Sequence, residues 1–261
     1  MNTIFKGISY MITIFIALIL FALLLNMQNT LVEINNPKKS TNSSFNITAY
    51  SLKNSSIISS SNQTNSNISI NDADVNNRVD IINRAKAMVE VSWTPNNNIV
   101  DSIGHYIFLK GKTYKGVPYS MGSTQVNTTS DFLANINKSN KLYGNDCSGF
   151  VSTAWGVSRQ TTLSLYNAIK NRNKIDGKSV ISISWEELKP GDAILRESGN
   201  GKGHIVLFIN YDEKNNDSIH VYEQNIGTLV PFAPIPTARE DQRSKKTLQK
   251  TGYMPIRLKN S

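Results

Sequence analysis

Apolar residues form an almost unbroken run over residues 8–25. Its length is close to the roughly 20 residues that a bilayer-spanning helix needs, so it predicts one transmembrane segment. Lys6 precedes the run and no charge follows before Glu33, which places residues 1–7 in the cytoplasm and the rest of the chain outside. The run is long for a signal peptide and lacks a small-x-small cleavage site. We therefore expect an uncleaved, single-pass signal anchor in the cell membrane, with secretion after cleavage as the alternative.

Polar residues dominate the next segment, residues 26–76, which is rich in Asn, Ser and Thr and shows no helical periodicity. Such a segment cannot bury enough apolar surface to offset the entropy lost on ordering. We expect a flexible, disordered tether here.

Helical periodicity begins near Asn77. The residues Val79, Ile82, Ala85 and Met88 recur at the spacing of one helical face. Further helices are predicted around residues 130–137, 147–155 and 162–171. Residues 106–110 fit either a strand or the end of a second helix.

The last third of the chain has the pattern of strands. Apolar stretches at residues 193–195, 204–209 and 218–223 are separated by turn signals at 189–192, 199–203 and 212–217. Helices followed by antiparallel strands indicate an α+β domain over residues 77–261, with helices packed on a small antiparallel sheet.

The net charge of the chain indicates the kind of environment in which the protein works. The chain has 28 Lys and Arg against 19 Asp and Glu, which gives a net charge of +9. No nucleic-acid-binding motif accompanies this charge, so we expect an anionic extracellular setting and no nucleic acid partner.

Cys147 is the only cysteine of the chain, so it is either a buried filler or a reactive thiol. It follows Asp146, a residue type that caps helices, and apolar residues then recur at helical spacing up to Gly156. We therefore expect Cys147 in the first turn of a helix, where partial positive charge favours the thiolate.

A thiol nucleophile needs a base within hydrogen-bond reach and a third polar group that orients the base. The three histidines are His105, His204 and His220. His204 opens an apolar strand after a glycine-rich turn, where its ring can face a neighbouring element. The alternative is a solvated histidine at a strand end.

The third group should come from the following strand. Alternation places Ile219, Val221, Glu223 and Asn225 on one face and His220 on the other. Because Ile219 and Val221 mark the core face, Glu223 is expected to point inward, where a histidinium would compensate its buried charge. A solvated Glu223 beyond the strand end is the alternative, and His220 is the other candidate for the third group.

Three strings in this order carry a resemblance to a known family: residues 146–151 (DCSGFV), 188–193 (LKPGDA) and 203–208 (GHIVLF). Over about residues 84–225 the chain resembles the NlpC/P60 and CHAP group of cysteine peptidases and amidases. Residues 116–122 (GVPYSMG) resemble the loop that opens the NlpC/P60 site, whereas residues 223–225 (EQN) are closer to the CHAP branch. The resemblance implies a papain-like fold.

The resemblance also implies residue roles. Cys147 would be the nucleophile and His204 the general base, with Glu223, Asn225 or His220 in the third position. Other residues would bind substrate or support the site: Tyr119 beside the nucleophile, Asp146 as a helix cap, Ser148 in contact with substrate, and Asn225. The spacing between Gly122 and Cys147 is longer than in compact members of the group, so the substrate groove is expected to differ.

The function that the resemblance implies is hydrolysis of amide bonds in cell-wall peptide, of peptidoglycan or pseudomurein, by an endopeptidase or an N-acetylmuramoyl-L-alanine amidase type of enzyme. It implies no cofactor, and the scattered histidines offer no metal site. We expect a monomer whose partners are the wall peptide and the membrane. The alternatives are a non-catalytic wall-binding module and an acyltransferase or transglutaminase on the same fold.

Overall fold

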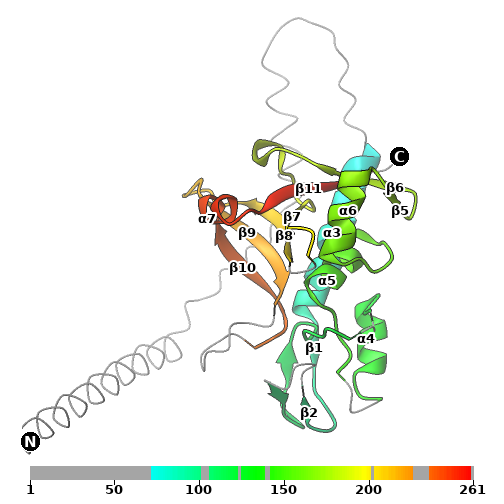
Figure 1. Cartoon of the computed structure of the whole chain (residues 1–261). Helices are drawn as coiled ribbons and strands as arrows, with labels where there is room; N and C mark the ends of the chain where they lie inside the picture. Colours follow the sequence, from blue (N-terminus) through cyan, green and yellow to red (C-terminus); the bar gives the residue numbers. More distant parts are fainter. Residues whose placement is uncertain are drawn as a thin grey trace, which may run out of the picture. The chain divides into compact units, whose positions relative to one another are not determined.

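The computed structural model describes residues 72–100, 106–122, 125–138, 142–200, 203–225 and 235–259, all within one unit of residues 66–261 (Figure 1). The predicted anchor at residues 8–25, the tether up to residue 71, and His105 lie outside these residues. No helix in the described ranges has the length and apolar character to cross a membrane.

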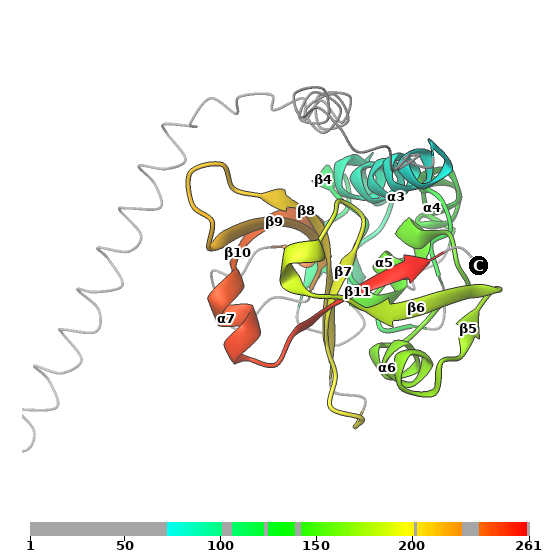
Figure 2. The ribbon, with the colours of Figure 1, turned by 90° about the horizontal axis from the view of Figure 1, so that it is seen from above.

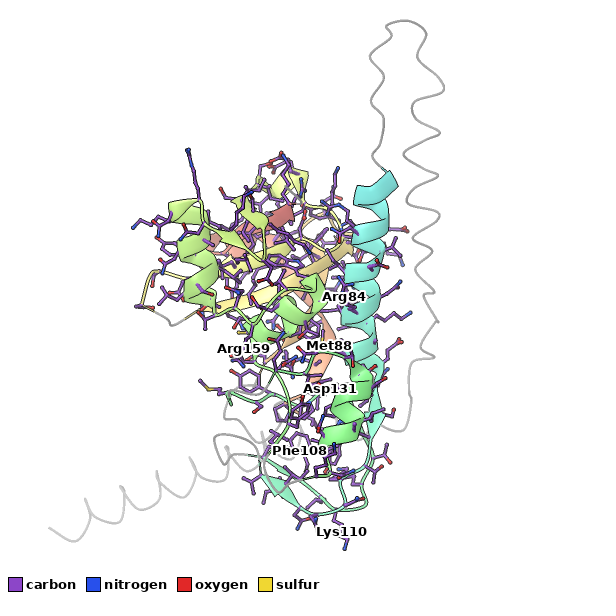
Figure 3. The ribbon with its side chains drawn as sticks, turned by 90° about the vertical axis from the view of Figure 1, so that its right-hand side faces the viewer. Arg84, Met88, Phe108, Lys110, Asp131 and Arg159 are labelled. Atoms are coloured by element: carbon purple, nitrogen blue, oxygen red, sulfur yellow. The ribbon has the colours of Figure 1, made fainter. Side chains whose placement is uncertain are left out.

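The first described helix, α3, spans Asp72–Glu90. It begins within the segment assigned to the tether, five residues before the predicted start at Asn77, because polar residues extend the helix beyond its apolar face. Ile82, Ala85 and Met88 are buried, as the periodicity predicted. Arg84 on the same helix donates from Nε to the carbonyl of Ala154 at 2.8 Å and so joins α3 to α5 (Figure 3).

A small lobe follows α3. It contains four two-residue strands, β1 (Ser92–Trp93), β2 (Ile99–Val100), β3 (Ile107–Phe108) and β4 (Tyr114–Lys115), and the helix α4 (Thr129–Asn135). The strands pair as β1 with β4 and β2 with β3. The open choice for residues 106–110 is therefore resolved as a strand. Phe108 lies inside the lobe against Trp93, and Lys110 lies at its tip (Figure 3).

The main sheet is larger than the small sheet predicted. In the described part of the chain, seven strands pair antiparallel in the order β10-β9-β8-β7-β11-β6-β5. Their bounds are β5 Lys174–Ile175, β6 Lys178–Ser182, β7 Ala193–Arg196, β8 His204–Tyr211, β9 Ser218–Gln224, β10 Ala238–Ser244 and β11 Met254–Lys259. Four of these strands, β5, β6, β10 and β11, have no counterpart in the sequence prediction. A short 3-10 helix, η2 (Trp185–Glu187), precedes β7.

Helices cover both sides of this sheet. Helix α5 (Cys147–Trp155) packs with α3 against β8 and β9, and α6 (Thr162–Asn171) packs against β6. Helix α7 (Lys245–Lys250) lies on the other side (Figure 2). One core cluster there joins sheet residues to Leu248 of α7: Leu188, Ile194, Val206, Phe208, Ile219 and Val221.

Candidate active site

The candidate nucleophile Cys147 is the first residue of α5 and is free, with 8% of its surface exposed. Asp146 caps the helix by accepting from the main-chain N–H of Gly149 at 2.6 Å. Gly156 ends the helix in the left-handed conformation, with φ 65°. The predicted helix and both of its ends are confirmed.

Asp146 is itself held on its other side. Arg159 donates from Nη2 to Oδ2 of Asp146 at 2.5 Å and from Nη1 to the carbonyl of Gly122 at 2.9 Å. The hydroxyl of Ser148 donates to Oδ1 of Asp146 at 3.0 Å, and Ser148 is buried. Ser148 therefore belongs to the network that fixes the helix start, and its contact with substrate stays a prediction.

Tyr119 reaches the site because its segment pairs with the residues before α5. It forms a parallel bridge with Asn145, and Gly144 packs so closely on Pro118 that a Cβ would lie 2.0 Å from the carbonyl oxygen of Pro118. Burial raises the pKa of Tyr119, and the nearby charges of Cys147 and Asp146 raise it further. Tyr119 thus stays protonated beside the nucleophile.

His204 is the first residue of β8. It directly follows Gly203, which packs tightly between the end of β7 and the start of α6. A Cβ at Gly203 would lie 2.5 Å from the carbonyl oxygen of Arg196 and 2.6 Å from the hydroxyl of Thr162. Only glycine fits between β7 and the start of α6 at this point. The close packing therefore fixes the start of β8 and, with it, the position of the His204 ring.

His204 lies next to Glu223, with its Nε2 3.4 Å from Oε2 of that carboxylate. Cys147 is close enough to raise the pKa of His204. Burial disfavours the imidazolium, but the hydrogen bonds and charges of Cys147 and Glu223 outweigh it and raise the pKa of His204 to about 9. His204 therefore holds a proton at neutral pH.

Glu223 lies on the face of β9 that alternation predicted and is 0% exposed. Two arginines from β10 bind it: Arg239 contacts Oε1, and Arg243 donates to Oε2 at 2.5 Å. Burial alone would raise the pKa of this carboxyl. The hydrogen bond to His204 and the charges of Arg239 and Arg243 instead lower it to about 2. Glu223 is therefore a permanent anion at the imidazole.

The two remaining candidates do not meet His204 in this way. His220 points to the other face of β9, where Nε2 lies 3.3 Å from Asp212 and Nδ1 lies 3.5 Å from Glu240. Asn225 lies just past the end of β9, and its main-chain carbonyl accepts from Arg239 at 3.4 Å. Of the three alternatives for the third position, Glu223 is the one that the structure brings to the base.

Sequence reasoning missed Arg239 and Arg243, because β10 carries no apolar alternation. The signal was present in another form: Arg239, Asp241 and Arg243 recur every second residue. Reading charges as well as apolar residues with period two would have found a strand with two arginines on one face.

The site brings together a thiol, an imidazole and a carboxylate, which are the kinds of group that nucleophilic catalysis by cysteine uses. Among the residues that the structure describes, no group of three or more His, Cys, Asp or Glu side chains could hold a metal ion.

Comparisons with protein-family models and with curated proteins found no match. Among solved structures, the chain is similar to the peptidoglycan hydrolase RipB from Mycobacterium tuberculosis, with 18% sequence identity and a TM-score of 0.38. The alignment covers 86% of this chain and 89% of that chain.

Proposed function

We propose that this protein is a cysteine hydrolase that cleaves amide bonds in cell-wall peptide outside the cell, anchored to the membrane by residues 8–25. One observation carries the chemistry: His204 lies close enough to Cys147 for the thiol to raise its pKa, and its Nε2 is 3.4 Å from the buried carboxylate of Glu223. The choice of wall peptide as substrate comes from the resemblance to the NlpC/P60 and CHAP group, and the net charge of +9 suits an anionic wall.

The proposed reaction begins with the thiol proton on His204. The thiolate of Cys147 attacks the carbonyl carbon of the amide, and the main-chain N–H at the start of α5 helps to hold the oxyanion. The C–N bond then breaks as His204 gives its proton to the leaving amine. Water attacks the thioester, His204 takes one of its protons, and the C–S bond breaks to release a carboxylic acid and the thiolate.

Glu223 acts through His204 in this scheme. A buried anion fixes the ring and stabilises the imidazolium. Arg239 and Arg243 in turn hold Glu223 in place and compensate its charge, because an unpaired buried carboxylate would be costly.

The experiment is digestion of purified wall sacculi by the full-length protein in detergent, with mass spectrometry of the released fragments. We expect Cys147→Ala to fold as the wild type does and to release nothing, because the thiol's role is chemical. His204→Ala should also be inactive, whereas His220→Ala, the matched control on the other face of β9, should stay active. Lysis by Cys147→Ala would refute the mechanism.

Transfer and hydrolysis share the thioester, so a second measurement separates them. An added amine acceptor, such as glycinamide, would appear in the products of an acyltransferase. We expect free carboxylic acids as the main products with the amine present.

A further inference from the structure

Arg196 is the last residue of β7 and pairs in register with His204, the first residue of β8. Directly opposite residues of an antiparallel pair lie on the same face, with their Cβ atoms roughly 5 Å apart. The side chain of Arg196 therefore leaves the sheet beside the candidate general base, on the same side.

Tyr253 orients this arginine. The guanidinium of Arg196 lies over the ring of Tyr253, 5.1 Å from its centroid. The same ring meets His204 edge-on, with a centroid separation of 6.5 Å. Tyr253 is partly buried, so it forms a fixed surface that holds Arg196 next to the imidazole.

The charge of Arg196 is left uncompensated. Arg239 and Arg243 both bind Glu223, whereas Arg196 is exposed and no carboxylate in the described residues lies within ion-pairing distance of it. A cation beside a protonated histidine is unfavourable in the free protein. A purely structural stack on Tyr253 would not require a charge at this position, but an anionic ligand would.

We propose that Arg196, oriented by Tyr253, binds a carboxylate of the substrate peptide next to the amide bond that Cys147 attacks. This inference rests on the proposed function and narrows the substrate to peptides with a free carboxylate close to the scissile bond. A guanidinium suits this task because it binds carboxylates through two parallel hydrogen bonds.

The test compares three synthetic peptides with the full-length protein. The first is the tetrapeptide L-Ala–γ-D-Glu–L-Lys–D-Ala, and the other two carry an amide either at the α-carboxyl of D-Glu or at the C-terminus. With the free peptide, Arg196→Gln should raise KM about tenfold or more, because a charge-assisted hydrogen bond is lost. One of the two amidated peptides lacks the carboxylate that Arg196 binds. With that peptide, wild type and Arg196→Gln should have equal KM.

Control variants separate the effect of the positive charge of Arg196 from the effect of losing any surface arginine. Arg172→Gln removes another exposed arginine, at the end of α6 and away from His204, and should leave KM unchanged. Tyr253→Phe should keep the stack and the low KM, whereas Tyr253→Leu should raise KM in the same peptide-dependent way. An equal loss in Arg196→Gln for all three peptides would overturn the inference.

Binding to the inactive Cys147→Ala protein makes this test independent of catalysis. By calorimetry, adding Arg196→Gln should weaken binding of the free peptide about tenfold and leave binding of one amide unchanged. If wild type cleaves no peptide but this pattern holds, hydrolysis is wrong and the carboxylate site stands. If Arg196→Gln changes no affinity, or all peptides bind equally, the carboxylate site is wrong whatever the enzyme does.

Discussion

At the scale of single residues, Glu223 has an unusual set of partners. A fully buried carboxylate contacts His204 and two arginines, so three groups that can carry positive charge surround it. The arginines reduce the pull of Glu223 on the imidazolium while they keep the carboxylate ionised. The balance leaves His204 basic enough to hold a proton at neutral pH; in the proposed mechanism it releases this proton to a leaving amine of higher pKa.

The first residue-scale prediction concerns this carboxylate. Glu223→Gln keeps the size of the side chain but removes the charge that stabilises the imidazolium, so we expect kcat to fall about 100-fold. His220→Ala should change kcat little, since His220 contacts Asp212 and Glu240 instead. The measurement is turnover of a wall peptide by both variants, and a larger loss in His220→Ala would move the third role to that residue.

A second residue-scale prediction concerns pH. Because the pKa of His204 is about 9, kcat/KM should fall as the pH rises through about 9 and the proton needed by the leaving amine is lost. Glu223→Gln should move this limb to lower pH, since the hydrogen bond and charge of Glu223 both raise the pKa of His204. Asp241→Asn removes a nearby carboxylate that does not contact His204 and serves as control. A limb that stays in place in Glu223→Gln would contradict the assignment.

The pKa shifts of His204 and Glu223 also make the stability of the fold depend on pH. The raised pKa of His204 contributes stability that is complete below its ordinary value of 6.5 and is lost as the pH rises through about 9. The lowered pKa of Glu223 contributes stability that is present above its ordinary value of 4.5 and is lost as the pH falls toward about 2. The pair therefore stabilises the fold most between about pH 4.5 and 6.5.

At the scale of elements, the start of β8 is set by packing against β7 and α6 at Gly203. In Gly203→Ala the new methyl group would meet the backbone of Arg196 and the side chain of Thr162, so β8 must shift and carry His204 with it. A displacement of about 1 Å at a catalytic group can cost about 100-fold in rate. We expect that loss in kcat, measured with a wall peptide, with Ser198→Ala of the same loop as an active control. Full activity of Gly203→Ala would show that the contact can relax without moving His204.

Elements with one clear apolar signal were predictable from sequence. The cap at Asp146, the glycine stop at Gly156 and the alternation that turns Glu223 inward are local patterns, and the structure reproduces each of them. Strand β10 was missed because its period-two pattern is one of charges instead of apolar residues, and with it Arg243, which binds Glu223. Strands β5, β6 and β11 were also not predicted, and Tyr253, which directly precedes β11 and meets the ring of His204, was missed with them.

At the scale of the whole described unit, Asp192 joins parts that are far apart in sequence. It is 1% exposed and binds Arg78 of α3 at 3.0 Å and Arg257 of β11 at 2.7 Å. It also accepts from the main-chain N–H of Lys189, within the Pro-Gly-Asp turn that leads into β7. Asp192 thus connects α3 and β11 to β7, the strand that pairs with β8.

Asp192→Asn should therefore act on stability and leave the chemistry intact. Asparagine removes the charge of a carboxylate that is 1% exposed and binds two arginines, so we expect a loss of about 3 kcal/mol in the free energy of unfolding. Urea unfolding of the full-length protein measures this loss. Asp176→Asn, at an exposed carboxylate where asparagine keeps one of the two hydrogen bonds accepted from Ser158, should change the unfolding midpoint far less. Because Asp192 does not touch Cys147, His204 or Glu223, turnover per folded molecule should stay near that of wild type. A variant as stable as wild type would mean that the contacts between α3, β7 and β11 are held by apolar packing alone.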